Sequence, residues 1–564
     1  MKRRSVAAVL ALFVGAAGPT AAAPSAPPHG AVVTVHALAT EAGVEALRAG
    51  GNAVDAVVAA GLVLGVVDGH NSGLGGGCLL LVRSPDGTIA AIDGRETAPA
   101  AATPGMFLVE GRADPALSRT GPLAVATPGQ PAAFHDALES FGRLPWRDHC
   151  RRAARIAAEG FDVGAGYAAR VRSVEAELAR DEGARAIFLR EDGSAIQAGD
   201  RLLQPDLARS LEALGDEGPA WFYRGPFANR VDAWMREHGG ILTADDLAAY
   251  APRRREPVTT RYRGRTIVGF PPPSSGGIHV GQILSILDRF DVGAMPPDGS
   301  DFRHLVAEAM KRAFADRARW LGDADHVPVP RGLIDPEYTA SLAAGIDPRR
   351  ATPVPAHGMP PRADTDLFPP AGHTTHFAAA DDEGWWVACT ATVNTTFGAK
   401  VVVPGTGIVL NDEMDDFVAE PGARNAFGLV GGEANAIAPG KRPLSSMAPS
   451  LVLEGDRPVM AVGAAGGPTI ISQVVLAIVH TIDFGAAPGE ALARPRFHHQ
   501  WSPDRLRIER SAGADAARSL EDRGHDVDDV DSIGAASILS RPDPHGPFTG
   551  AAEPRVPESS FEGW

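Results

Sequence analysis

Two short runs of hydroxyl-bearing residues are the first candidates for chemistry in this chain. They are residues 374–376 (TTH) and, a little later, residues 392–398 (TVNTTFG). The stretches 375–380 and 385–393 are rich in Thr, Val, Trp, Phe and Ala, which favours strands. Residues 381–384 (DDEG) between them predict a turn whose glycine takes a positive φ. The sequence therefore predicts a β-hairpin with a threonine near each open end.

The length of the turn decides whether these threonines meet. If the loop comprises residues 382–384, Thr374 lies opposite Thr392 across an antiparallel pair. One hydroxyl can then orient or polarise the other, as an activated nucleophile requires. The alternative for the threonines alone is ordinary β-propensity.

Other motifs in the same chain argue against that alternative. They occur in a fixed order over most of the sequence: residues 50–56 (GGNAVDA), 72–77 (SGLGGG), 93–99 (DGRETAP), 272–277 (PPSSGG), 412–417 (DEMDDF), 441–447 (KRPLSSM) and 463–467 (GAAGG). With the two threonine runs, these blocks resemble the gamma-glutamyltransferase (gamma-glutamyltranspeptidase, glutathione hydrolase) family of N-terminal-nucleophile hydrolases. The resemblance covers about residues 30 to 555.

The resemblance implies a self-cleaving precursor. The bond between His373 and Thr374 would be cut by the protein itself, and the freed Thr374 would be the catalytic nucleophile. A free α-amino group titrates near 7.7 to 8.0, so it can act as the base within the same residue. Thr392 would hold the nucleophile in position. Gly466 and Gly467 would present backbone N–H groups to the oxyanion.

The resemblance also implies a clamp for the free amino-acid end of a γ-glutamyl group. Arg95 would bind the α-carboxylate, a task that suits a planar guanidinium, and Ser445 and Ser446 would help to hold the same group. The acceptors for the α-ammonium would be Asn394, Glu413 and Asp416. Taken alone, these residue types are more typical of surface ion pairs and loops.

Residues 421–442 occupy the position of the family's active-site lid. Their glycines and prolines suit a cover that excludes water from the acyl-enzyme. Phe427 stands where several bacterial relatives carry a tyrosine, so a hydrogen bond from a phenol is absent while the ring can still cover the pocket. The lid favours a small donor such as glutathione.

Other enzyme classes are not indicated by the motifs. Residues 73–78 lack the final glycine of a dinucleotide fingerprint, and Gly440 and Lys441 lack the earlier glycine of a P-loop. No G-x-S-x-G nucleophile elbow occurs, and His498 and His499 have no third metal ligand nearby in sequence. We therefore expect no cofactor and no metal.

The composition and the N-terminal residues agree with an exported enzyme that acts on small molecules. The chain of 564 residues has 53 basic and 69 acidic residues, which argues against a nucleic-acid partner. Its three cysteines show no CxxC spacing and are expected to be inert thiols. Residues 1–23 have the charged start, apolar centre and small-residue end of a signal peptide. The mature protein is expected to be periplasmic or secreted, without a membrane partner.

The elements that must position these residues mix helix and strand. Residues 302–320 place apolar side chains on one helical stripe, with charged ones such as Arg303 and Lys311 opposite. Residues 77–81 with 89–92, and 450–453 with 458–462, indicate strand pairs. The resemblance implies an α+β fold, a four-layer αββα sandwich. A signal peptide (1–23), a large subunit (24–373) and a small catalytic subunit (374–564) would be divided from one precursor, and the two subunits would form a heterodimer with one shared core.

The expected reaction is transfer of a γ-glutamyl group from glutathione or a related amide to water, an amino acid or a peptide. Two alternatives stay open. A glutaryl group is γ-glutamyl without its ammonium, so a cephalosporin (glutaryl) acylase of the same superfamily would share most of this machinery. A binding protein with an inactive site is favoured if the precursor never cleaves.

Overall fold

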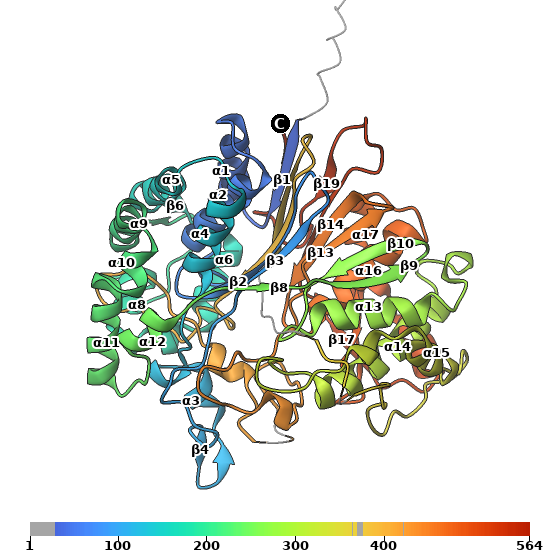
Figure 1. Ribbon diagram of the computed structural model, residues 1–564. Coiled ribbons are helices and arrows are strands. Elements are labelled where there is room, and N and C mark those ends of the chain that lie inside the picture. Colours follow the sequence, from blue (N-terminus) through green and yellow to red (C-terminus); the bar gives the residue numbers. More distant parts are fainter. Residues whose placement is uncertain (1–28, 364, 369–375, 421, 423) are drawn as a thin grey trace, which may run out of the picture.

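The computed structural model describes residues 29–363, 365–368, 376–420, 422 and 424–564. Its centre is a pair of antiparallel sheets lying face to face, with helices on both outer sides (Figure 1). The seven-stranded sheet runs in the order β20 (Ser560–Gly563), β1 (Gly30–Thr34), β11 (His376–Asp381), β12 (Trp386–Thr392), β2 (Gly77–Arg83), β3 (Ile89–Gly94) and β8 (Arg253–Arg255).

The second sheet has six strands. Its order is β19 (Thr549–Ala551), β18 (Ala535–Ser540), β14 (Arg457–Ala465), β13 (Ser450–Glu454), β10 (Arg265–Gly269) and β9 (Val258–Tyr262). The predicted strand pairs 77–81 with 89–92 and 450–453 with 458–462 are therefore confirmed, as β2 with β3 and β13 with β14.

Alternation along the strands builds the layers. On β2, Leu79 and Leu81 join the core between the two sheets, whereas Leu80 and Val82 face the helices on the other side. This period of two is what a strand buried on both faces requires. The outer helical layers are formed mainly by α1 (Ala37–Arg48), α2 (Ala53–Val67), α4 (Gln130–Phe141) and α5 (Trp146–Glu159) on one side, and by α13 (Gly276–Leu287), α14 (Ser300–Trp320) and α16 (Thr469–Ile482) on the other. The predicted four-layer αββα sandwich is confirmed.

Helix α2 shows how local sequence fixes one of these elements. Asn52 caps its first turn, and Asp55 completes a reciprocal capping box with the Asn52 backbone N–H. Nearly every residue of the helix is buried, since it lies between the first sheet and α1, α4 and α5. The apolar run 53–67 is thus a core helix.

Helix α14 is more deeply buried than its periodicity indicates. The predicted polar face is covered as well: Glu308 and Lys311 are buried and form an ion pair of 2.8 Å. Lys311 Nζ also donates to the Thr352 carbonyl, in a segment that packs over this face. A buried charge needs such a partner, and the helix alone does not reveal that one is supplied from elsewhere in the chain.

Candidate functional site

The hairpin of β11 and β12 has the predicted register. His376 pairs with Thr390 and Ala380 with Trp386, which leaves residues 382–384 as the loop. Gly384 has φ +102°, as the turn requires. The pairing of Thr374 with Thr392 stays a prediction, because the printed register begins at His376 and Thr390. His373 and Thr374 themselves lie outside the described residues.

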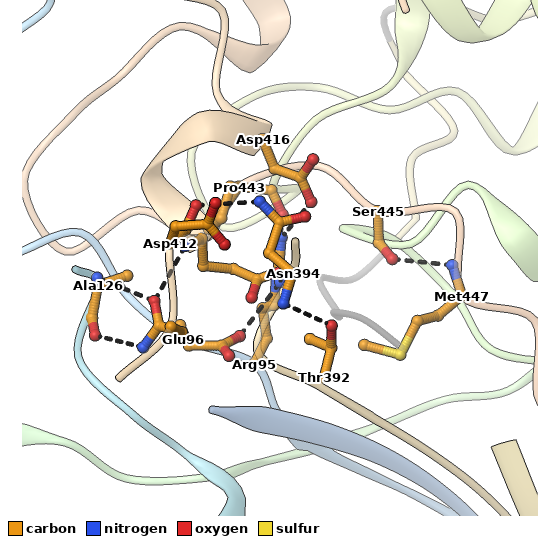
Figure 2. A network of polar contacts seen from close by, with 12 residues as sticks. Arg95, Glu96, Ala126, Thr392, Asn394, Asp412, Asp416, Pro443, Ser445 and Met447 are labelled. Carbon is orange, nitrogen blue, oxygen red and sulfur yellow. Dashed lines mark hydrogen bonds and ion pairs between the residues drawn. The ribbon is translucent and has the colours of Figure 1, made fainter. Parts of the chain in front are cut away.

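Thr392, at the end of β12, and Asn394, in the loop that follows, line one cavity. Thr392 Oγ1 accepts a 2.7 Å hydrogen bond from the Asn394 N–H, and Asn394 Nδ2 donates to the Asp412 carbonyl at 3.0 Å (Figure 2). Asn394 has φ +75°, a conformation that asparagine adopts more readily than most residues. These bonds fix the side chain, and its Oδ1 has no partner within the described parts of the chain.

Arg95 lies at the centre of an acidic cluster below the cavity. Its side chain is 0% exposed, and its guanidinium contacts Glu413, Glu96 at 3.1 Å and Asp416 at 3.1 Å. Nε donates to the Pro443 carbonyl at 3.3 Å. Arg95 and Glu413 do not line the cavity, whereas Asp416 does. In this structure Arg95 reaches the cavity through Asp416, and its direct contact with a substrate carboxylate stays a prediction.

Burial governs the electrostatics of this cluster. It raises the pKa of Glu413 and of Asp416 well above their ordinary values, although the charge of Arg95 opposes the shift. It also raises the pKa of Glu96 to about 7. Three carboxyl groups around one guanidinium therefore hold protons more strongly than exposed acids do. A cation arriving beside Asp416 would favour its ionised form.

The conformation of the segment that carries Ser445 and Ser446 is fixed by contacts with residues 272–277. The Ser275 N–H donates to the Ser445 carbonyl at 2.9 Å, and Ser274 Oγ donates to the Met447 carbonyl at 2.5 Å. A Cβ on Gly276 would overlap that Met447 carbonyl, so only glycine permits this approach. Ser445 Oγ accepts from the Met447 N–H at 2.8 Å (Figure 2), and it is Ser446 that lines the cavity.

Sequence reasoning missed Arg317, a cation in the cavity wall. It is 4% exposed, and its guanidinium donates to Ser275 Oγ at 2.9 Å and to Ser446 Oγ at 3.1 Å. Burial lowers its pKa to about 10, with Asp416 opposing the shift, so it remains protonated at neutral pH. The signal was available, because Arg317 follows Phe314 by three residues and thus lies on the apolar stripe of the helix.

Gly466 and Gly467 form the turn between β14 and α16. Their φ angles of +131° and +59° are unfavourable for other residues. Both line the cavity, and neither backbone N–H has an acceptor in the described parts of the chain. The loop is braced by Gln473, whose Nε2 donates to the Ala465 carbonyl at 2.9 Å. Two free N–H groups at the start of a helix can stabilise an oxyanion.

The lid segment covers this turn through Phe427. A Cβ on Gly467 would lie 2.6 Å from Phe427 Cδ1, so the ring lies directly against the glycine. Asn425 Nδ2 donates to Asp416 Oδ1 at 3.2 Å, which ties the lid to the acidic cluster. The Phe427 ring therefore covers this part of the cavity.

One cavity of about 480 Å³ collects most of the predicted site. Its wall includes Thr392, Asn394, Asp416, Phe427, Ser446, Gly466 and Gly467, together with Arg317.

Cys78, Cys150 and Cys389 are free and buried. Over the described ranges, no group of three His, Cys, Asp or Glu side chains is placed to hold a metal ion. No described helix is both long and apolar enough to cross a bilayer.

Several known proteins resemble this chain, some of them over nearly its whole length. A sequence model of the family described as Gamma-glutamyltranspeptidase matches residues 39–562. The glutathione hydrolase proenzyme of Escherichia coli (strain K12) is 41% identical over 99% of this chain and 98% of its own. The cephalosporin acylase of Bacillus halodurans superposes with a TM-score of 0.83 at 27% identity, covering 98% of this chain and 99% of that one. A chain of Helicobacter pylori gamma-glutamyltranspeptidase has a TM-score of 0.56 at 34% identity, covering 59% of this chain and 95% of its own.

Proposed function

Because this chain belongs to the gamma-glutamyltranspeptidase family, we propose that it cleaves itself before Thr374 and then transfers γ-glutamyl groups from glutathione and related amides to water, amino acids or peptides. The observation that supports this most is the shared cavity. Thr392, the Gly466–Gly467 turn, Asp416 and Ser446 line one cavity. Thr392 ends the strand that pairs with β11, which begins two residues after Thr374. A nucleophile, an oxyanion site and an amino-acid clamp are the parts that the reaction needs.

The acyl transfer follows from these parts. The α-amino group of Thr374 takes the hydroxyl proton while Oγ attacks the γ-carbonyl carbon of the donor, with Thr392 holding the nucleophile in position. The oxyanion receives hydrogen bonds from the Gly466 and Gly467 N–H groups. The C–N bond breaks, the leaving amine takes up the proton, and a γ-glutamyl ester remains on Thr374. Water or an amine then attacks that ester and restores the free hydroxyl.

The donor's α-amino acid group is bound by opposite charges on two sides. Asn394 Oδ1 and Asp416 accept from the ammonium, and Glu413 supports Asp416 through their shared contact with Arg95. Ser446 donates to the carboxylate, and Arg317 holds that hydroxyl while supplying positive charge. Arg95 holds Asp416 and Glu413 in position, and we retain its predicted contact with the carboxylate. Ser445 acts through its hydrogen bond to the Met447 N–H.

Maturation would leave two interlocked subunits. We propose that residues 24–373 form the large subunit and residues 374–564 the small one, after removal of residues 1–23 during export to the periplasm or the medium. The proenzyme from Escherichia coli carries its precursor state in its name, and the matching Helicobacter pylori chain covers only part of this sequence. A self-processed heterodimer accounts for both facts.

A pair of donors distinguishes this function from glutaryl acylase activity. γ-Glutamyl anilide carries the α-ammonium, whereas glutaryl anilide lacks it and is otherwise similar. We expect the enzyme to prefer γ-glutamyl anilide, because Asn394 and Asp416 would gain nothing from a glutaryl group. Removing one partner of a buried charge pair costs on the order of 2 to 5 kcal/mol. Asp416→Asn should therefore lower kcat/KM for γ-glutamyl anilide at least about 30-fold, and for glutaryl anilide far less.

Glu420→Gln is the matched control, since it removes an exposed acid from the same segment. It should behave like the wild type with both donors. Preference of the wild-type enzyme for glutaryl anilide, or equal losses on both donors in Asp416→Asn, would favour the acylase instead.

A further inference from the structure

The turn between β14 and α16 is held from behind by a chain of hydrogen bonds that ends at a buried glutamine. Gln473 lies near the start of α16 and is 2% exposed. Its Nε2 donates to the Ala465 carbonyl at 2.9 Å and to Thr469 Oγ1 at 3.1 Å. Thr469 Oγ1 in turn donates to the Gly466 carbonyl at 2.8 Å. The glutamine amide therefore holds two successive carbonyls of the turn, one directly and one through a hydroxyl.

These two carbonyls belong to the same peptide groups as the proposed oxyanion donors. The Ala465 carbonyl shares its peptide plane with the Gly466 N–H, and the Gly466 carbonyl shares its plane with the Gly467 N–H. In a trans peptide the C=O and the N–H point in opposite directions. A carbonyl that is held on the side of α16 therefore turns the N–H of the same peptide toward the cavity, which both glycines line.

The backbone of this turn cannot supply that restraint by itself. Gly466 and Gly467 have φ angles of +131° and +59°, and glycine adopts other φ values about as readily. Stabilisation of an oxyanion depends on donors that are already aimed at it before the reaction begins. The two peptide groups must therefore be held by side chains from outside the turn.

Arg496 determines which way round the Gln473 amide lies. Arg496 Nη1 donates to Gln473 Oε1 at 3.2 Å, and a guanidinium has no acceptor. The amide must therefore present its oxygen to Arg496 and its NH₂ group to the turn. Arg496 is itself 4% exposed and donates through Nη2 to Glu553 at 2.7 Å. The donors thus run in one direction, from the guanidinium to the carbonyls of the turn.

A neighbouring loop closes the remaining side of the amide. A Cβ on Gly534 would overlap Gln473 Nε2 and would lie 2.5 Å from the Ala465 carbonyl oxygen, so the backbone packs directly against both. Arg496 Nη1 also donates to the Ile533 carbonyl at 3.0 Å, which fixes this loop to the same guanidinium. The glutamine amide consequently has a single orientation and a single position.

We propose that Gln473 is a positioning residue for the acyl-transfer step. Its amide, oriented by Arg496, sets the directions of the Gly466 and Gly467 N–H groups, so that both meet the oxyanion without rearrangement. Gln473 does not line the cavity, and it therefore acts on the rate of the chemical step and not on the binding of the donor. This inference rests on the proposed γ-glutamyl transfer.

Two substitutions of similar size remove the amide donor. Gln473→Met has no hydrogen-bonding group of comparable strength, and the carboxylate of Gln473→Glu accepts from Arg496 but cannot donate to the Ala465 carbonyl. With γ-glutamyl anilide, each variant should lower kcat about 100-fold, as the loss of one oxyanion donor does, while KM stays within about threefold of wild type. Rates are divided by the amount of chain that begins at Thr374, measured by mass spectrometry, so that incomplete maturation is counted separately.

Thr469 offers a conservative pair for the second peptide group. Thr469→Ser keeps the hydroxyl that donates to the Gly466 carbonyl, whereas Thr469→Val keeps the shape of the side chain and removes the hydroxyl. Thr469→Ser should retain kcat within about twofold, and Thr469→Val should lower it about tenfold or more without raising KM. If a Gln473 variant yields no cleaved chain, this pair decides, and equal kcat in the two Thr469 variants contradicts the inference.

The control is His480→Gln, which alters a buried side chain about two turns further along α16. It should leave kcat and KM unchanged even where it lowers Tm. If Gln473→Met and Gln473→Glu keep the wild-type kcat, or raise KM alone, Gln473 does not position the oxyanion donors. An equal loss of kcat in His480→Gln would assign the effect to the stability of the helix and would also overturn the inference. A wild-type enzyme that fails to hydrolyse γ-glutamyl anilide at all would instead contradict the proposed function.

Discussion

At the scale of single residues, Arg317 is the side chain whose role can be separated most clearly. Its guanidinium bridges Ser275 and Ser446 in the cavity wall. Three donors isolate the carboxylate: γ-glutamyl and glutaryl anilides carry it, and 4-aminobutanoyl anilide does not. Arg317→Gln should lower kcat/KM for the first two about 30-fold or more, since a lost charge partner costs roughly 2 kcal/mol or above. The third donor should be affected little.

Arg317→Lys should retain only part of the wild-type activity with these donors. A lysine ammonium lacks the planar guanidinium with which Arg317 bridges two hydroxyls. Arg319→Gln, an exposed change two residues along the same helix, should have no effect on any donor. Equal loss on all three donors would mean that Arg317 merely supports the loop.

Residue types were predictable from the sequence, but their partners were not. Thr392, Asn394, Asp416 and Ser446 line one cavity, as the motifs indicated. The surroundings of Arg95 could not be predicted, because Glu413 and Asp416 come from a segment more than three hundred residues away. Which carboxylates enclose a guanidinium depends on how distant segments pack.

At the scale of elements, the turn between β14 and α16 should control the chemical step. Gly467→Ala places a side chain at φ +59° and a Cβ 2.6 Å from Phe427, so the turn and its N–H groups must move. Loss of one oxyanion donor typically costs 10²- to 10³-fold in rate, and we expect kcat to fall by about that factor.

The control is Gly485→Ala, a substitution just after the C-terminal end of α16. It has φ +66° and no atom within 4 Å of the added Cβ, so it should cost about 1 kcal/mol of stability while kcat is retained. Retention of kcat in Gly467→Ala as well would remove this turn from the oxyanion site.

Elements defined by local pattern were predicted well. The hairpin register and the two strand pairs follow from alternation and turn residues. The burial of the polar face of α14 was not predicted. Glu308 and Lys311 are covered by the segment around Thr352, which has no helical or strand periodicity of its own.

At the scale of the whole molecule, buried histidines make stability depend on pH. Burial lowers the pKa of His498 to about 3, below the value near 6.5 of an exposed histidine. Between these values the unfolded chain binds a proton that the folded chain excludes, so this contribution is complete above pH 6.5 and is lost on acidification. The stability difference between wild type and His498→Gln should fall by about 1.2 kcal/mol from pH 6 to pH 5.

Urea unfolding at the two pH values measures this difference. His545→Gln, which replaces an exposed histidine, should run parallel to the wild type. If the free energy of unfolding of His498→Gln changes with pH as that of the wild type does, the buried His498 ring does not govern acid stability.

The first sheet also explains how a cut chain would stay together. Strands β11 and β12 lie between β1 and β2, so segments from both sides of the proposed cut share one sheet and one core. The sandwich itself was expected from the resemblance, since mixed helix and strand patterns permit several layered folds.

The most direct test of the account is the state of the purified chain. Mass spectrometry should find two tightly associated chains, one of which begins at Thr374 and ends at Trp564. Thr374→Ala should remain a single chain, because the hydroxyl that attacks the His373 carbonyl is gone. A Thr374→Ala protein still cut between His373 and Thr374, or a folded wild-type protein that never cleaves, would contradict the central claim.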